Sequence, residues 1–284
     1  MKAIKSVAVL GAGTMGHGIA QVAAQAGRDV RLADAQPGAA ERGVERIRKN
    51  LDGAVERGKA TAEDRDLALG RIRTFADARQ AADGCDLVIE AVPEQLAIKQ
   101  DLFKAVEPVL GKHAILATNT SSLSVAAIAA AAERPGRVIG MHFFNPVHLM
   151  RLVEVVVHEG TQPAVRKAAV AFVTELGKEP IVVKDSPGFA SSRLGVALGL
   201  EAMRMLEDGV ASAEDIDKAM VLGYNHPMGP LRLTDLVGLD VRLAIARYLH
   251  DTLGSATFKP PALLERLVAE GKLGKKSGQG FYPW

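Results

Sequence analysis

The 284-residue sequence has a single cysteine, Cys85, and this scarcity excludes two kinds of structural support. One cysteine cannot build a disulfide framework, and no Cys–His cluster supplies the ligands of a structural zinc site. No pair of histidines has convincing metal-ligand spacing either, so we expect no bound metal. Such cysteine usage is typical of a reducing compartment, and we expect a cytoplasmic protein.

A large excess charge and a long apolar run are also missing. The 35 Lys and Arg residues and 33 Asp and Glu residues leave a formal charge of +2, too balanced for a protein that binds nucleic acid or anionic membranes. No segment approaches the roughly 20 apolar residues of a membrane-spanning helix. The longest uncharged segment, residues 113–132, is interrupted by Asn119, Thr120 and three serines. We therefore expect neither nucleic acid nor a membrane as a partner.

The composition, 48% hydrophobic and 24% charged, is that of a globular protein, and its first part alternates short β-branched runs with longer helical stretches. This alternation predicts a parallel sheet of βαβ units, with a basic helical stretch over residues 41–73 between the second and third strands. Thr61 and Asp64 have the capping-box spacing of a second helix inside that stretch. Strands are expected at residues 6–10, 30–34, 87–90, 114–118, 138–143, 152–157 and 180–183.

The strand signal stops after Asp185, and the remaining pattern is helical. Helices are expected over residues 189–207, 213–222, 231–253 and 262–270. We therefore predict an α/β domain over residues 1–184 and an all-α domain over residues 185–284, without a flexible linker between them.

The motif Gly11-Ala12-Gly13-Thr14-Met15-Gly16 follows a predicted strand and precedes a helical run, with Asp34 at the end of the next strand. This context is that of a Rossmann-type dinucleotide-binding loop, in which Gly11, Gly13 and Gly16 let the backbone approach a pyrophosphate. The helix N-terminus supplies N–H donors for it. Asp34 is expected to accept hydrogen bonds from the adenosine ribose, which favours NAD as the cofactor.

Glu154 lies within the apolar run Leu152–Val157, where an unpaired carboxylate costs several kcal/mol. The nearest candidate partner is His142, at the end of the preceding strand, because a short connection brings two successive strand ends together. A carboxylate behind an imidazole fixes its tautomer and makes it a general base for alcohol oxidation. His148, in the loop after His142, is the alternative base, and a purely structural His–Glu pair remains open.

Other polar residues at strand ends have two interpretations each. Ser121, in Asn119-Thr120-Ser121-Ser122, follows the fourth strand at the edge where such sheets bind ligands, but serine there is as often a helix cap. Glu94 and Lys99 follow the third strand, and an exposed charged helix start is equally compatible with them.

Taken together, GAGTMG, EAVPE, TNTSSLS, GMHFFNPV, LVEVV, DSPGF, NHPMGP and GKKSGQGFY resemble the L-3-hydroxyacyl-CoA dehydrogenase family, within it the short 3-hydroxybutyryl-CoA dehydrogenase type. The resemblance covers nearly the whole chain in unbroken order. It implies NAD-dependent oxidation of an (S)-3-hydroxyacyl-CoA to the 3-ketoacyl-CoA, and the reverse reaction. It also implies a homodimer formed through the helical domain.

The resemblance also implies roles for individual residues. His142 takes the hydroxyl proton, Glu154 orients it, and Ser121 hydrogen-bonds the substrate oxygen. Lys49 and Arg57, in the basic stretch, are expected to meet the phosphates of CoA. Cofactor contacts fall on Gly11, Gly13, Gly16, Asp34, Glu94, Lys99, Ser121, Asn145 and Lys276.

At one position the sequence departs from the family pattern. Relatives commonly read PGF-x-x-Asn-Arg, with the asparagine assisting at the active site, whereas Ser192 stands there in this chain. Serine is shorter and lacks the two fixed functions of an amide. The departure affects the expected rate and substrate preference rather than the reaction type.

Two other functions remain open on the sequence. One is a related NAD-dependent dehydrogenase of a sugar acid or another 3-hydroxy acid without CoA, which the basic region over residues 46–59 disfavours. The other is a non-catalytic NAD-binding protein, which would have no reason to bury Glu154.

Overall fold

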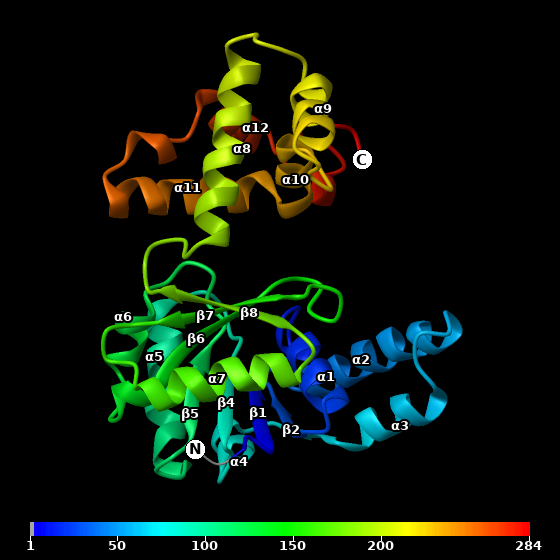
Figure 1. The fold of residues 1–284 in the computed structure, drawn as a ribbon, viewed down its shortest axis with the longest axis vertical. Coiled ribbons are helices and arrows are strands. Elements are labelled where there is room, and N and C mark those ends of the chain that lie inside the picture. Colours follow the sequence, from blue (N-terminus) through cyan, green and yellow to red (C-terminus); the bar gives the residue numbers. More distant parts are fainter. Residues whose placement is uncertain (1–2) are drawn as a thin grey trace. The chain divides into compact units, whose positions relative to one another are not determined.

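The computed structural model describes residues 3–284, and the chain divides into two compact units, one ending at Ser186 and the other spanning Pro187–Trp284. Figure 1 shows the strands in the first unit and helices α8–α12 in the second. This order confirms the predicted fold class, an α/β domain followed by a helical one.

The first unit is built on one eight-stranded sheet with the order β3-β2-β1-β4-β5-β6-β7-β8. All neighbouring strands are parallel except β6 and β7. The strands are β1 (Ser6–Leu10), β2 (Asp29–Ala33), β3 (Ile72–Phe75), β4 (Leu87–Glu90), β5 (Ile115–Thr118), β6 (Val138–Phe143), β7 (Leu152–Val157) and β8 (Glu179–Lys184). The apolar runs that predicted β4, β5 and β6 are buried along their whole length, as expected for central strands.

The strand order reverses between β1 and β4, because β2 and β3 extend the sheet on one side and β4–β8 on the other. At such a switch point the loops after neighbouring strands diverge and leave a crevice at the carboxyl ends of the strands. The glycine motif follows β1, so the topology places it at this crevice.

Two features of this sheet differ from the prediction. The strand β7 runs antiparallel to β6, since the eight residues between them are too few for a parallel crossover. The strand β3 overlaps the end of the stretch expected to be helical, and it was missed because Ile72–Phe75 is never fully buried and includes Arg73. It forms the edge of the sheet beside β2.

The helices of the first unit pack on the sheet, with α1 against β1 and β2 and α7 against β6, β7 and β8; α7 crosses the front of the sheet in Figure 1. They are α1 (Gly16–Gln25), α2 (Ala39–Glu56), α3 (Ala62–Gly70), α4 (Ala78–Ala82), α5 (Leu96–Val106), α6 (Val125–Ala129) and α7 (Pro163–Glu175). The predicted capping box of Thr61 and Asp64 is formed at the start of α3. Helix α2 buries one face, through Ala40, Gly43, Ile47 and Leu51, and exposes its basic residues.

The second unit is a bundle around buried Val196, Leu200, Met203, Leu231 and Leu249. Its helices are α8 (Ser191–Glu207), α9 (Ala213–Gly223), α10 (Pro230–Val237), α11 (Leu239–Leu253) and α12 (Ala262–Ala269). The single helix expected over residues 231–253 is broken at Gly238, whose φ of 107° is incompatible with a helix. Two buried carboxylates anchor the C-terminal segment: Asp235 accepts the Tyr282 N–H at 2.9 Å, and Asp217 accepts the Tyr282 hydroxyl at 2.8 Å.

Candidate active site

The glycine motif forms a tight turn between β1 and α1 that has no space for larger side chains at two of its three glycines. A Cβ atom on Gly11, whose φ is 102°, would lie 2.5 Å from the Ala91 carbonyl oxygen, and one on Gly16 would lie 1.6 Å from the Gly11 oxygen. A Cβ on Gly13 would instead meet nothing within 4 Å, so this part of the loop faces open space. The turn therefore presents bare backbone where a pyrophosphate would approach the start of α1.

Asp34 directly follows β2 and lies beside this turn. Its Oδ2 accepts the Ala12 N–H at 2.8 Å and its Oδ1 accepts the Gln36 N–H at 2.9 Å. These two bonds fix the carboxylate at the end of the strand, where it can also accept from ribose hydroxyls.

A cleft of about 640 Å³ connects the loops after β1, β2, β3 and β4. Its lining includes Gly13, Asp34, Arg42, Arg46 and Pro93. The close-packed glycines, the open face at Gly13 and the fixed carboxylate fit a dinucleotide with an unsubstituted ribose. NAD would be held here by the loop backbone and Asp34.

His142 and Glu154 lie directly opposite each other in the register of β6 and β7. The His142 Nδ1 and Glu154 Oε2 atoms are 2.7 Å apart, Glu154 is fully buried and His142 is 7% exposed. An ionised carboxylate only accepts hydrogen bonds, so Nδ1 carries the proton and Nε2 is left as the basic nitrogen. The buried acid that the sequence singled out thus has the imidazole partner expected for it.

Residues 119–122, called the Ser121 loop below, follow β5 and are held from two sides. Asn119 Oδ1 accepts the Phe143 N–H at 2.8 Å, which joins this loop to the end of β6 beside His142. On the other side, Glu94 Oε1 accepts the Ser121 N–H at 2.9 Å and the Thr120 hydroxyl at 2.5 Å. The carboxylate of Glu94 therefore caps the loop that carries Ser121.

Lys99 is fully buried on α5, and three oxygen atoms lie close to its ammonium group. Its Nζ lies 2.6 Å from Glu90 Oε1, 3.2 Å from Glu94 Oε2 and 3.4 Å from the Val92 carbonyl oxygen. The exposed helix start considered from the sequence is therefore wrong for Lys99. Each of the three ammonium protons of Lys99 has an acceptor, so this lysine holds Glu90, Glu94 and the loop after β4 in place.

The sequence reasoning missed Glu90, the last residue of β4. It is fully buried, and Thr118 donates to its Oε2 at 2.6 Å while the Val92 N–H donates to its Oε1 at 2.7 Å. Burial raises the pKa of Glu90, and the adjacent Lys99 charge and these donors oppose that rise. The sequence could have indicated Glu90 as a buried acid, because it ends the apolar strand β4 just as Glu154 interrupts the apolar strand β7.

The loop between β6 and β7 carries Asn145, which is exposed and precedes Pro146 through a cis peptide bond. His148 further along this loop has its pKa lowered by burial and by the charges of His17, Lys178 and Arg57. Among residues 3–284 no hydrogen bond or ion pair joins His148 to a carboxylate, so His142 is the better-supported base.

The predicted CoA-binding cations, Lys49 and Arg57, are exposed on and just after α2. Arg57 is one of the charges that lower the pKa of His148, which lies in the loop after β6. Lys178, 7% exposed, donates to the Val147 and Met150 carbonyl oxygens at 2.6 and 2.7 Å and fixes that loop.

Two predicted site residues belong to the second unit. Ser192 lies in the first turn of α8. Lys276 is half-exposed and pairs with Asp240 at 2.5 Å, and hydrogen bonds from Lys276 and from backbone N–H groups lower the pKa of Asp240 against the effect of its burial.

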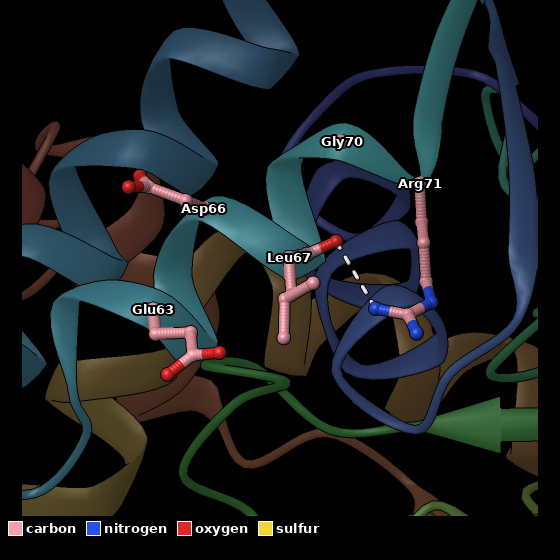
Figure 2. A pocket seen from close by; sticks show the side chains of 5 residues that line it. All are labelled: Glu63, Asp66, Leu67, Gly70 and Arg71. Atoms are coloured by element: carbon pink, nitrogen blue, oxygen red, sulfur yellow. Dashed lines mark hydrogen bonds between the residues drawn. The ribbon is translucent and has the colours of Figure 1, made fainter.

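A separate hollow lies on the outer surface of α3 (Figure 2), lined by Glu63, Asp66, Leu67, Gly70 and Arg71. Its internal hydrogen bond runs from Arg71 Nη1 to the Leu67 carbonyl oxygen at 3.1 Å. None of the sequence-predicted site residues lines this hollow, and we assign it no role in the candidate active site.

Within the described part of the chain, no group of three or more His, Cys, Asp or Glu side chains could hold a metal ion. Over the same residues, no helix is both long enough and apolar enough to cross a membrane.

Two family models match consecutive parts of the chain. The NAD-binding domain of 3-hydroxyacyl-CoA dehydrogenase matches residues 6–186, and the C-terminal domain of 3-hydroxyacyl-CoA dehydrogenase matches residues 188–284.

Individual proteins with similar sequences and structures extend this match over the whole chain. A probable 3-hydroxybutyryl-CoA dehydrogenase of Bacillus subtilis is 45% identical over 99% of this chain and 98% of its own length. The human mitochondrial hydroxyacyl-coenzyme A dehydrogenase is 42% identical over 99% of this chain and 91% of its own. The crystal structure of an (S)-3-hydroxybutyryl-CoA dehydrogenase from Ralstonia eutropha superposes with a TM-score of 0.96 at 40% identity, with 99% of each chain covered.

Proposed function

Because the chain belongs to the 3-hydroxyacyl-CoA dehydrogenase family, we propose that its preferred substrate is short, (S)-3-hydroxybutyryl-CoA, oxidised to acetoacetyl-CoA with NAD. The family relationship makes the protein an NAD-dependent oxidoreductase of 3-hydroxyacyl-CoA. The substrate length is supported by relatives at 42–46% identity whose names specify the butyryl compound.

The observation that carries the chemistry is the buried His142–Glu154 pair at the carboxyl edge of the sheet. Because its Nδ1 proton is donated to Glu154, the basic nitrogen of His142 is Nε2, and this atom takes the proton of the substrate hydroxyl. Bound NAD supplies the hydride acceptor for carbon 3, and NADH supplies the hydride in the reverse direction. Glu154 stabilises the imidazolium that forms, and it orients the ring.

Ser121 is proposed to donate a hydrogen bond to the substrate oxygen, which carries increasing negative charge as the proton leaves. Its loop is anchored to the His142 strand through Asn119, and this connection supports a fixed spacing between donor and base. Asn145, Glu94 and Lys276 are proposed on the cofactor side, and Lys49 and Arg57 on the CoA phosphates, with Ser192 assisting in place of the family asparagine.

We also propose a cytoplasmic homodimer assembled through the helical unit. Large apolar side chains on that unit are exposed, including Leu194 at 71% and Leu222 at 80%. Large apolar side chains that are exposed on a monomer are often covered in an oligomer interface. Light scattering at micromolar concentration is expected to give twice the mass of the 30.0 kDa chain, and a monomer would contradict the proposal.

The substrate assignment is tested with a ladder of 3-ketoacyl-CoA substrates of increasing length and with free acetoacetate, each with NADH. We expect the highest kcat/KM with acetoacetyl-CoA and little turnover of the free acid. Turnover of acetoacetate as efficient as that of its CoA ester would instead favour a dehydrogenase of non-CoA acids.

A further inference from the structure

We propose that Glu94 is a positioning residue, which holds the Ser121 loop in place for the substrate, and that the buried Lys99–Glu90 pair holds Glu94 in turn. This inference rests on the proposed role of Ser121. In this inference a series of contacts runs from buried Glu90 through Lys99 and Glu94 to the Ser121 loop.

The donors of the Ser121 loop converge on one oxygen atom. Glu94 Oε1 accepts the Thr120 hydroxyl at 2.5 Å and the Ser121 N–H at 2.9 Å, with the Ser122 N–H at 3.3 Å. The hydroxyls of Ser121 and Ser122 both lie 3.4 Å from the same atom. A carboxylate oxygen has about two lone-pair sites, so the closest two donors occupy them.

This competition leaves the Ser121 hydroxyl free for another partner. Its 3.4 Å contact is weak, whereas its own backbone N–H is firmly bound. The backbone of Ser121 is therefore fixed while its side chain can turn toward a substrate oxygen.

Lys99 and Glu90 determine where the Glu94 carboxylate lies. Oε2 of Glu94 is 3.2 Å from the Lys99 Nζ, and its Oε1 consequently points to the loop. The lysine itself cannot move, because Glu90 holds it at 2.6 Å and Thr118 and the Val92 N–H hold Glu90. Two carboxylates share one cation, and the loop N–H groups balance the remaining negative charge.

The test is a double-mutant cycle between Glu94→Gln and Ser121→Ala, measured as kcat/KM for acetoacetyl-CoA at saturating NADH. In Glu94→Gln either the amide NH₂ faces the Lys99 cation or it faces the loop donors, so one side loses its acceptor. We expect a loss of roughly tenfold in the wild-type background and less than about twofold in the Ser121→Ala background. Each variant is assayed with NADH saturating for that variant, so the contact of Glu94 with the cofactor proposed above does not enter the comparison.

Equal losses in both backgrounds would overturn the inference, because Glu94 would then act independently of Ser121. The matched control is Asp101→Asn, a carboxylate-to-amide change on the following helix, α5, whose exposed side chain pairs with Lys104 at 3.7 Å.

The support behind Glu94 is tested with Glu90→Gln/Lys99→Met, because Lys99→Met alone would leave Glu90 as an unpaired buried charge that can prevent folding. The double variant should show the same fall in kcat/KM as Glu94→Gln, and the fall should again be smaller in the Ser121→Ala background. The exposed control is Lys104→Met. An unchanged kcat/KM in a folded double variant would contradict the role of the pair.

Hydrogen exchange of the Ser121 amide provides a measurement that does not need activity. Glu94→Gln should accelerate its exchange by about tenfold or more, since its acceptor is lost or turned away. Unchanged exchange would overturn the inference. An inactive wild-type enzyme with accelerated exchange in Glu94→Gln would instead contradict the proposed function and leave the loop support standing.

Discussion

His142 and Glu154 are cross-strand partners in the only antiparallel pair of the described sheet, with Nδ1 and Oε2 2.7 Å apart. The carboxylate is fully buried, so its charge acts on the imidazole with little screening by water. This geometry determines which ring nitrogen is basic.

Replacing Glu154 with glutamine should therefore impair catalysis through the tautomer. The amide NH₂ can donate to Nδ1 and drive the histidine proton to Nε2, where it blocks proton abstraction. We expect kcat to fall by roughly 10²–10⁴-fold with the Kd for NADH little changed. Steady-state kinetics with acetoacetyl-CoA and fluorescence titration of NADH measure both quantities, and a variant with normal kcat would show that the two residues are not coupled.

Asp34 should make the enzyme discriminate against NADPH. A 2′-phosphate would lie beside its carboxylate and lose the ribose hydrogen bonds, so we expect NADH to be preferred by about tenfold or more in kcat/KM. Asp34→Ala should lower the ratio of kcat/KM with NADH to kcat/KM with NADPH. The reason is that Arg42 and Arg46 line the same cleft and can bind the added phosphate. Asp29→Ala, at the exposed amino end of β2, is the control. Equal efficiency of wild-type enzyme with the two cofactors would contradict this role of Asp34.

Ser192 tests the departure from the family asparagine. If its hydroxyl bonds substrate or an ordered water, Ser192→Ala should lose roughly threefold to tenfold in kcat/KM, the value of one hydrogen bond. Ser192→Asn should be tolerated, with a changed chain-length preference across the acyl-CoA ladder. Unchanged kinetics of the alanine variant on every substrate would make Ser192 a structural residue of the first turn of α8.

The charge of Glu94 should contribute stability that depends on pH. Burial raises the pKa of Glu94, but Lys99, the Thr120 hydroxyl and the Ser121 N–H lower it by more, so the folded value lies below the usual 4.5. A carboxyl with a depressed folded pKa stabilises the protein above its unfolded pKa and loses that contribution as the pH falls through the folded value.

The destabilisation caused by Glu94→Gln should consequently be largest near neutral pH and shrink as the pH falls below the usual glutamate pKa. Urea unfolding of the wild-type protein and the variant at several pH values measures it. A difference in unfolding free energy that stays constant with pH would contradict the ionised state of Glu94.

The sequence was sufficient for most of the sheet because buried parallel strands are continuous apolar runs, which is how β4 and β6 were found. A partly exposed strand that includes a charged residue carries no such signal, and β3 was missed for that reason. Gly238 was not recognised as a helix break, since a single glycine is compatible with a helix and only its backbone angle shows otherwise.

The His142–Glu154 pair could be predicted because Glu154 is a charged residue inside an apolar strand, where it needs a partner. The Glu90–Lys99–Glu94 arrangement could not be assembled from the sequence, because its members come from β4, the loop after it and α5. The register and helix packing that bring them within 2.6–3.2 Å are tertiary properties.

The measurement that tests the account most directly is the turnover of acetoacetyl-CoA with NADH by wild-type enzyme and His142→Ala. We predict robust turnover by the wild type and a loss of roughly 10²–10⁴-fold in the variant, at an unchanged Kd for NADH. Near-normal turnover by folded His142→Ala would contradict the central claim and transfer the proton-accepting role to another residue, with His148 the next to test.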